Sequence, residues 1–191
     1  MDKTALFIDG SNFYAAAKGL NLDIDFARMR AYFAKETNLI RAYYYTAIPE
    51  DQEFSSLRPL VDWLDYNGYA VVSKLTREFI DEETGKRRLK GNMDMELALD
   101  MLKLAPHIDH AILFSGDGDF CRLLEDVQAL GVRTTVVSTN KTTPPMVADQ
   151  LRRMADIYID MVDIAPDISK SNSKTSSKLA SKPSVKATND A

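Results

Sequence analysis

The sequence predicts a three-layer α/β sandwich with a mostly parallel central sheet. Short apolar runs alternate with segments of helical pattern along most of the 191 residues, and such alternation favours parallel strands joined by right-handed crossovers. The first apolar run, residues 4–9, is continuous rather than alternating, as expected of a strand that is buried on both faces. A hydrophobic content of 45 % suits one domain with a substantial core.

The elements can be placed in order along the chain. The expected strands are residues 4–9, 39–48, 69–75, 110–115 and 132–138, with a short last strand around Ile157 and Ile159. The expected helices are residues 26–37, 52–67, 93–105, 120–130 and 144–154. Gly68 and Gly131 follow two of these helices, where glycine supplies the positive φ that ends a helix. Pro144 stands where the last helix is expected to start, since proline suits a first turn.

Two segments depart from the alternation. Residues 77–90 contain a Thr84-Gly85 turn signal between short strand-like runs, which predicts a protruding hairpin. Residues 166–191 are rich in Ser and Lys and lack aromatic residues, so a disordered tail is expected after a domain of residues 1–165.

The charge and the cysteine content limit the classes of function. The chain carries a net charge of −4, and the tail has five lysines and two aspartates, so residues 1–165 carry −7. An acidic domain argues against nucleic acid, unless several acids are gathered for one cation and leave the remainder nearer neutral. No apolar run is long enough to span a membrane and no signal peptide is expected, so no membrane partner is predicted. The single cysteine, Cys121, excludes an internal disulfide and a cysteine-based metal site, and indicates a reducing cytoplasm.

Four aspartates are expected to meet in one pocket. Asp9 ends the first strand, Asp117 and Asp119 directly follow the fourth, and Asp94 begins a helix. Ligands of open α/β sheets bind beyond the carboxyl ends of the strands, so these acids converge if the first and fourth strands are neighbours. Two carboxylates about 4 Å apart repel by roughly 1 kcal/mol in water and ~4 kcal/mol at an effective dielectric of 20. The cluster therefore predicts a hard divalent cation, Mg²⁺ or Mn²⁺.

Each aspartate alone also has a structural interpretation. Asp9 can cap a helix that starts at Gly10, and Asp117 or Asp119 can cap the helix that follows Phe120. Asp94 can be a first-turn acid that the helix dipole favours. The joint occurrence at strand ends, rather than any one residue, favours the metal site.

Three ordered motifs resemble the NYN domain family, in its LabA-like branch, over roughly residues 3–160. They are Phe7-Ile-Asp-Gly-Ser-Asn12, Lys90-Gly-Asn-Met-Asp94 with Leu97-Ala-Leu-Asp100, and Ser115-Gly-Asp-Gly-Asp-Phe120. The family belongs to the PIN-like nuclease superfamily. The resemblance implies a Rossmann-like α/β/α sandwich whose acids bind Mg²⁺ or Mn²⁺ to hydrolyse RNA phosphodiesters.

By matching position, the resemblance implies that Asp9, Asp94 and Asp117 are metal ligands and that Asp119 is a fourth catalytic acid. Asn12 is expected to orient Asp9 or touch a phosphate. Ser115, Ser138 and Thr139 are expected at strand ends that face the same pocket. Asp100 falls in the motif but lies about 240° around the helix from Asp94, so we interpret it as structural.

Basic residues suggest where RNA would bind. Six of them lie in or next to the predicted hairpin that precedes Asp94: Lys74, Arg77, Lys86, Arg87, Arg88 and Lys90. They can guide a phosphodiester backbone to the acids, or form a solvated surface paired with the hairpin's own acids. Tyr43, Tyr44 and Tyr45 can stack on a base or belong to the core. The predicted partner is single-stranded or structured RNA, and homo-oligomerisation is left open.

The predicted function is a metal-dependent ribonuclease, in which a cation activates water and Asp119 positions that water or accepts its proton. A haloacid-dehalogenase-like phosphatase needs a second acid where this chain has Ser11, and no GxGxxG or GxxxxGK[ST] loop is present. His107 and His110 are expected at the opposite edge of the sheet. A non-catalytic metal- or RNA-binding regulatory module remains open, since structural and catalytic cations take the same ligands.

Overall fold

The computed structural model describes residues 1–49, 57–76, 78–80, 87–89 and 92–170. Its main sheet has six strands in the order β3-β2-β1-β6-β7-β8, and every neighbouring pair is parallel. The strands are β1 (Lys3–Asp9), β2 (Asn38–Pro49), β3 (Ala70–Thr76), β6 (His110–Phe114), β7 (Arg133–Ser138) and β8 (Ile157–Asp160). The predicted fold class is confirmed, and the sheet is parallel throughout.

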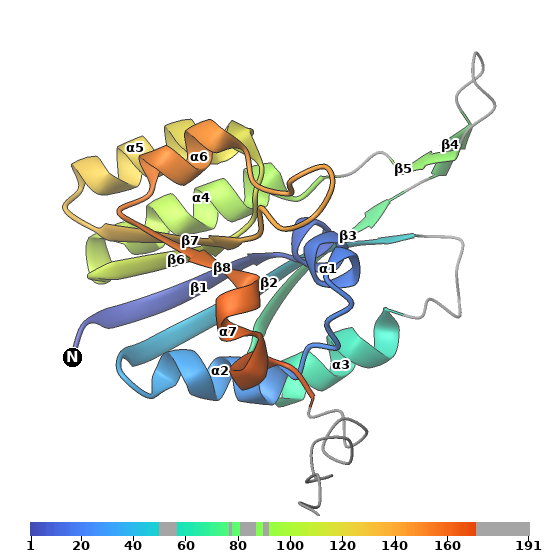
Figure 1. The fold of residues 1–191 in the computed structure, drawn as a ribbon, viewed down its shortest axis with the longest axis horizontal. Helices are drawn as coiled ribbons and strands as arrows, with labels where there is room; N and C mark the ends of the chain where they lie inside the picture. The colour runs from blue at the N-terminus through green and yellow to red at the C-terminus, as the bar shows by residue number, and fades with distance from the viewer. Residues whose placement is uncertain (50–56, 77, 81–86, 90–91, 171–191) are drawn as a thin grey trace, which may run out of the picture.

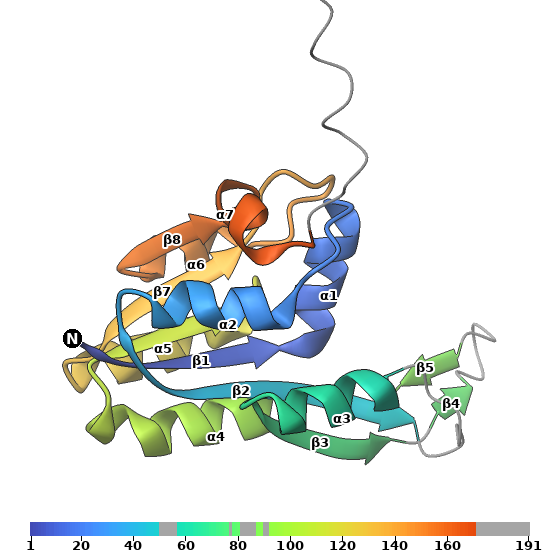
Figure 2. The same cartoon turned by 90° about the horizontal axis from the view of Figure 1, so that it is seen from below.

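Helices cover both faces of the sheet, which gives the three layers seen in Figure 1. One layer contains α4 (Asp94–Leu104), α5 (Cys121–Ala129) and α6 (Asp149–Met154). The other contains α1 (Gly10–Gly19), α2 (Phe26–Ala34), α3 (Arg58–Tyr66) and α7 (Met161–Ile168). Figure 2 views the molecule from the side of α2 and α3.

The central strand β1 explains why its sequence is apolar without alternation. Ala5 and Phe7 pack in the core beneath α4 and α5, while Leu6 and Ile8 pack against α1 and α2. All four side chains are fully buried. Both faces of the strand are therefore core, as the continuous apolar run predicts.

The strand order creates a switch point between β1 and β6. From β1 the chain winds outward through β2 to β3, then returns across the sheet to β6 on the other side of β1 and winds outward to β8. The chain leaves β1 toward one face of the sheet and β6 toward the other, and ligands of open α/β sheets bind at such a switch point, beyond the carboxyl ends of the strands. Residues 9–12 and 115–119 meet at this point.

The structure changes the predicted set of helices at three places. α1 was weighed only as the helix that Asp9 can cap, α7 was not expected, and α6 begins at Asp149 rather than at residue 144. Residues 139–148 form a loop instead, in which the N–H groups of Met146 and Val147 donate to the carbonyl of Thr139. The fold also continues past residue 165, because the Lys170 N–H donates to the Asp23 carbonyl at 2.9 Å. Residues 171–191 lie outside the described part of the chain.

The predicted hairpin is present as β4 (Glu78–Ile80) and β5 (Arg87–Leu89), which pair antiparallel. It extends beyond the end of β3 (Figure 1). Its predicted turn at Thr84-Gly85 lies outside the described residues. Among the helices that the structure describes, none has the length and apolar character needed to cross a bilayer.

Candidate active site

Asp9 is held at the end of β1 by three hydrogen bonds. Its Oδ1 accepts from the Ser11 hydroxyl at 3.0 Å and from the Asn12 N–H at 3.2 Å, and its Oδ2 accepts from the Ser115 hydroxyl at 3.0 Å. The side chain is 8 % exposed. Asp9 therefore caps α1 and is joined to the loop after β6, so its structural and site interpretations both apply.

The loop after β6 is fixed by residues of the same group. The Ser115 hydroxyl accepts from the Asp117 N–H at 3.2 Å, and the Gly116 N–H donates to Asn12 Oδ1 at 2.9 Å. Asp117 Oδ1 accepts from the Asp119 N–H at 3.0 Å and so caps a 3-10 turn, Gly118–Phe120. Asn12 and Ser115, both predicted to bind substrate, act here to join the loops after β1 and β6.

Gly116 lies where the 139–148 loop approaches most closely. A Cβ on Gly116 would lie 2.0 Å from the Met146 carbonyl oxygen, and the Gly116 carbonyl accepts from the Ala148 N–H at 2.8 Å. Ser138 and Thr139 are 1 % and 0 % exposed behind this contact. Contrary to the prediction, these two residues do not line an open pocket, because the loop folds back over the end of β7.

The pKa of Asp94 shows that the other predicted acids lie near it. It begins α4, and its Oδ2 accepts from the Asn92 amide at 2.5 Å. Burial raises the pKa of Asp94 to about 6, and the negative charges of Asp9, Asp117 and Asp119 add to this effect, followed by Glu96. Asp94 is thus close enough to the other three predicted acids for their charges to raise its pKa. Asp119 is the exposed member of the group.

Asp100 lies apart from these acids, as its helical position predicts. It accepts a hydrogen bond from the Tyr45 hydroxyl at 3.3 Å and lies 3.8 Å from the Lys103 ammonium. It is absent from the charges that raise the pKa of Asp94. Burial, with the Asp100 charge next, raises the pKa of Tyr45 instead.

The acids suit a hydrated cation better than one enclosed by protein. Within residues 1–49, 57–76 and 92–170, no three Asp, Glu, His or Cys side chains stand close enough to form a ready-made metal site. Both oxygens of Asp9 and one of Asp117 already accept hydrogen bonds. Mg²⁺ commonly keeps several waters and takes only one or two protein carboxylates. The all-oxygen donor set and its mutual repulsion fit such an ion.

The basic hairpin is described only in part. The Lys74 ammonium lies 2.6 Å from Glu96 Oε1, and this hydrogen bond lowers the pKa of Glu96. Lys74 is therefore salt-bridged, but to an acid of α4 rather than to one of the hairpin's own acids. Arg87 and Arg88 lie in β5, but their side chains are outside the described part of the chain, as is the whole of Lys90. Their contacts with RNA stay predictions.

The tyrosines of β2 and His110 belong to the fold, while His107 is exposed. Tyr44 and Tyr45 are buried, and Tyr43 stacks on Phe7 with ring centroids 5.5 Å apart. His110 begins β6 at the amino edge of the sheet, with its Nε2 2.7 Å from the Thr135 hydroxyl. Burial, with the charge of Arg133 next, lowers the pKa of His110.

Sequence reasoning missed two groups beside Asp9. Ser11 holds Asp9 Oδ1, and its position two residues after a capping aspartate was the available signal. Burial raises the pKa of Tyr44 to about 12, and the negative charge of Asp9 contributes to that rise. Tyr44 lies near Asp9 because β1 pairs with β2, which places Ile8 opposite Tyr44. No local sequence signal reveals it.

Comparisons with known proteins agree with this architecture. The model of the NYN domain matches residues 3–166. The Low amplitude and bright protein LabA of Synechococcus elongatus is 38 % identical over 172 residues, which cover 88 % of this chain and 89 % of that protein. A solved structure from Vibrio parahaemolyticus, described as a protein of unknown function, superposes with a TM-score of 0.70 at 24 % identity. That likeness covers 88 % of this chain and 96 % of the other, and it concerns the fold.

Proposed function

This chain belongs to the NYN domain family, whose fold is of the PIN-like nuclease type, and from that premise we propose that it is a metal-dependent ribonuclease. The proposed substrate is single-stranded or structured RNA, and the proposed cofactor is Mg²⁺ or Mn²⁺. The proposed ligands are Asp9, Asp94 and Asp117, which would hold the cation partly through its water molecules, since no three described acids form a ready-made site. Asp119 is the proposed base.

One observation carries the proposal. The pKa of Asp94 rises to about 6 because burial and three neighbouring aspartates oppose its charge. Helix capping accounts for Asp9 and for Asp117 singly, but gathering four acids at the switch point of the sheet is unfavourable without a counter-ion. Strongly perturbed acids in a crevice are typical of functional sites.

The residues divide the chemistry among them. When bound, the cation would neutralise charge on the phosphate and lower the pKa of a water. Ser11, Ser115 and the Asn12 N–H fix the orientation of Asp9, so that this ligand needs no rearrangement. Asp119 is exposed and is available to accept the proton from the attacking water. The oxygen of that water bonds to phosphorus as the bond to the leaving ribose oxygen breaks.

A non-catalytic binding module is the second candidate, and a specific observation favours it. Both oxygens of Asp9 already accept hydrogen bonds in a helix cap and a loop anchor, and no three described acids form a preassembled site. The same residues can therefore hold the loops together without turnover. The two candidates predict different results with RNA.

The deciding experiment is incubation of the purified protein with 5′-labelled single-stranded and hairpin RNAs in Mg²⁺, in Mn²⁺ and in EDTA. We expect cleavage that requires the cation and falls at least a hundredfold in Asp117→Asn. Asparagine retains an oxygen that can cap the Asp119 N–H, so the loop should persist. Asp126→Asn is the matched control, because Asp126 is a surface acid of α5 paired with Arg122 at 2.8 Å.

The control variant should cleave at the wild-type rate. An unchanged rate of cleavage in Asp117→Asn would contradict the catalytic assignment. Cation-dependent binding of RNA without any cleavage would instead establish the second candidate.

A further inference from the structure

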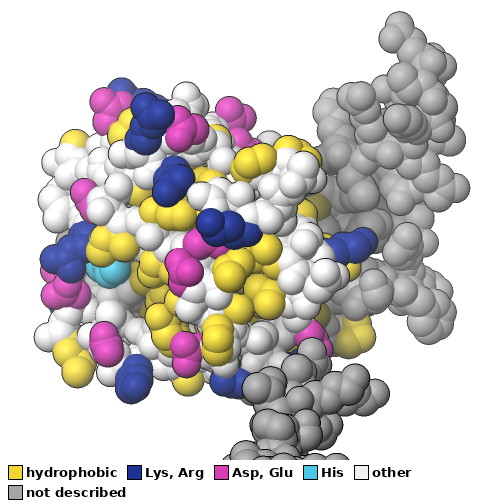
Figure 3. Space-filling view, in the orientation of Figure 1, with side chains coloured by type: hydrophobic (Ala, Val, Ile, Leu, Met, Phe, Trp, Pro, Cys, Tyr) yellow, Lys and Arg dark blue, Asp and Glu magenta, His cyan; other side chains and the backbone are white. Residues whose placement is uncertain are grey.

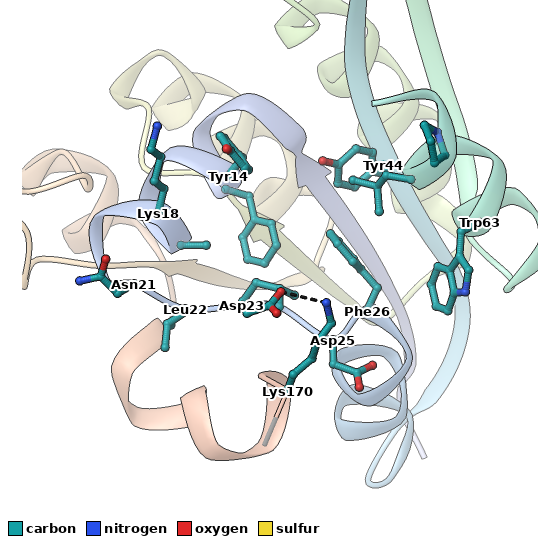
Figure 4. Close-up of a pocket in the computed structure, with 15 residues that line it drawn as sticks. Tyr14, Lys18, Asn21, Leu22, Asp23, Asp25, Phe26, Tyr44, Trp63 and Lys170 are labelled. Atoms are coloured by element: carbon teal, nitrogen blue, oxygen red, sulfur yellow. Dashed lines mark hydrogen bonds and ion pairs between the residues drawn. The ribbon is translucent and has the colours of Figure 1, made fainter. Parts of the chain in front are cut away.

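A large pocket lies in the layer formed by α1, α2 and α3. Its volume is about 850 Å³, which is within the range of ligand sites. Its walls are mainly apolar and include the aromatic rings of Phe13, Tyr14, Phe26, Tyr44 and Trp63. In Figure 4, Tyr14 and Trp63 stand on opposite sides, with Phe26 and Tyr44 between them. Tyr14 and Trp63 are 63 % and 39 % exposed, so both can meet a ligand.

The rim of this pocket is polar. Lys18, in the last turn of α1, and Asn21 are both exposed. Asp23 is paired with the Lys170 ammonium at 3.0 Å, and Asp25 accepts from the Arg28 N–H as the cap of α2. Figure 3 shows exposed hydrophobic side chains in the middle of the face drawn in Figure 1, with charges of both signs around them. The rim thus offers a cation and amide groups, while its two acids are already engaged.

The pocket adjoins the acidic site through Tyr44. A Cβ on Gly10 would lie 2.8 Å from Cζ of Tyr44, so the tip of this ring packs against Gly10. Gly10 directly follows Asp9 in the chain and is the first residue of α1. Tyr44 is therefore both a wall of the pocket and a neighbour of the residue that follows the first proposed metal ligand.

We propose that this pocket binds an unpaired base of the RNA whose backbone passes the acidic site. This inference rests on the proposed function and names the substrate class as single-stranded. Aromatic faces stack on bases whatever the sequence, and Lys18 is placed to meet a phosphate. A paired base is already stacked within its helix, so duplex RNA cannot fill the pocket in this way.

The chain carries its own reporter for this site. Trp63 is its single tryptophan, and it lines the pocket. We expect a single-stranded oligoadenylate to change the Trp63 fluorescence in a saturable way in EDTA, where no cleavage occurs. A duplex of the same length should leave the fluorescence unchanged.

A matched pair of variants tests the stacking. Tyr14→Ala should weaken binding of the single strand roughly tenfold, as expected for loss of one base stack. Tyr66→Ala removes a tyrosine at the end of α3 that is 90 % exposed but does not line the pocket, and this variant should bind as the wild type does. Because Tyr14 is largely exposed, its removal should leave the fold intact, which circular dichroism checks.

The outcomes separate this inference from the proposed function. Binding that changes Trp63 fluorescence and requires Tyr14, without cleavage in Mg²⁺ or Mn²⁺, would uphold the base pocket and overturn the nuclease. Acid-dependent cleavage with an unchanged KM in Tyr14→Ala would overturn the base pocket and leave the nuclease standing. Equal fluorescence changes with single strand and duplex would also overturn the base pocket, since the protein would then contact phosphates alone.

Discussion

At the scale of single residues, a structural role and a proposed functional role fall on the same side chain. Asp9 caps α1 with one oxygen and holds Ser115 with the other. Its place at a strand end could be read from the sequence, because aspartate directly follows a buried apolar run. The burial of Ser138 could not, since it depends on the return of the 139–148 loop, whose Met146 carbonyl leaves no room for a Cβ on Gly116.

Asp94→Asn should stabilise the cation-free domain near neutral pH. The folded pKa of about 6 is above the ordinary value of 3.8, so the stability linked to this group is fully present below pH 3.8 and is lost as pH rises through 6. Allowing for solvent screening, the gain at pH 7.5 should be about 1 kcal/mol. Thermal unfolding in EDTA should show the gain at pH 7.5 and little at pH 4. A lower melting temperature at pH 7.5 would contradict the mutual repulsion of the acids.

At the scale of elements, periodicity predicts the long units and misses those that depend on tertiary contacts. α1 opens with Gly10, Ser11 and Asn12, which are poor helix formers, yet Asp9 caps it and Phe13 packs in the core. α7 contains Pro166, the residue at which the sequence suggested the end of the domain. The two prolines at 144 and 145 suggested a helix start that the loop replaces. In each case packing outweighs local preference.

Asn12→Ala should loosen the contact between α1 and the loop after β6. The Gly116 N–H would lose its acceptor, Asn12 Oδ1, at a partly buried position, and such a loss costs about 1–2 kcal/mol. Urea unfolding should show this decrease, and hydrogen exchange should show faster exchange of the Gly116 amide. Asn38→Ala, which truncates an exposed asparagine of β2, should change neither. Unaltered exchange at Gly116 would mean that the bond does not restrain the loop.

At the scale of the whole molecule, the fold class follows from the order of elements, but the site depends on the order of strands. The alternation of strands and helices is visible in the sequence. The adjacency of β1 and β6 is not, because their contact spans most of the chain. The prediction that four acids share one pocket assumed that these two strands are neighbours. The pairing of Ile8 with Phe114 shows that they are.

Divalent cations should stabilise the entire domain. An ion that binds only the folded state adds about 2.7 kcal/mol at a hundred times its Kd, which corresponds to roughly 5–10 °C in a domain of this size. We expect Mg²⁺ or Mn²⁺ to raise the Tm by such an amount over NaCl of equal ionic strength. Asp94→Asn/Asp117→Asn should abolish the increase. An equal increase in that double variant would place the cation elsewhere.

The central position of β1 has a consequence during synthesis. β1 is made before every other strand, yet one of its edges is completed only when β6 emerges roughly 100 residues later. Until then a fully apolar segment, Ala5 to Ile8, keeps an open backbone edge to which other chains can add. The strand that ends at Asp9 is therefore exposed to association with other chains until β6 has been made.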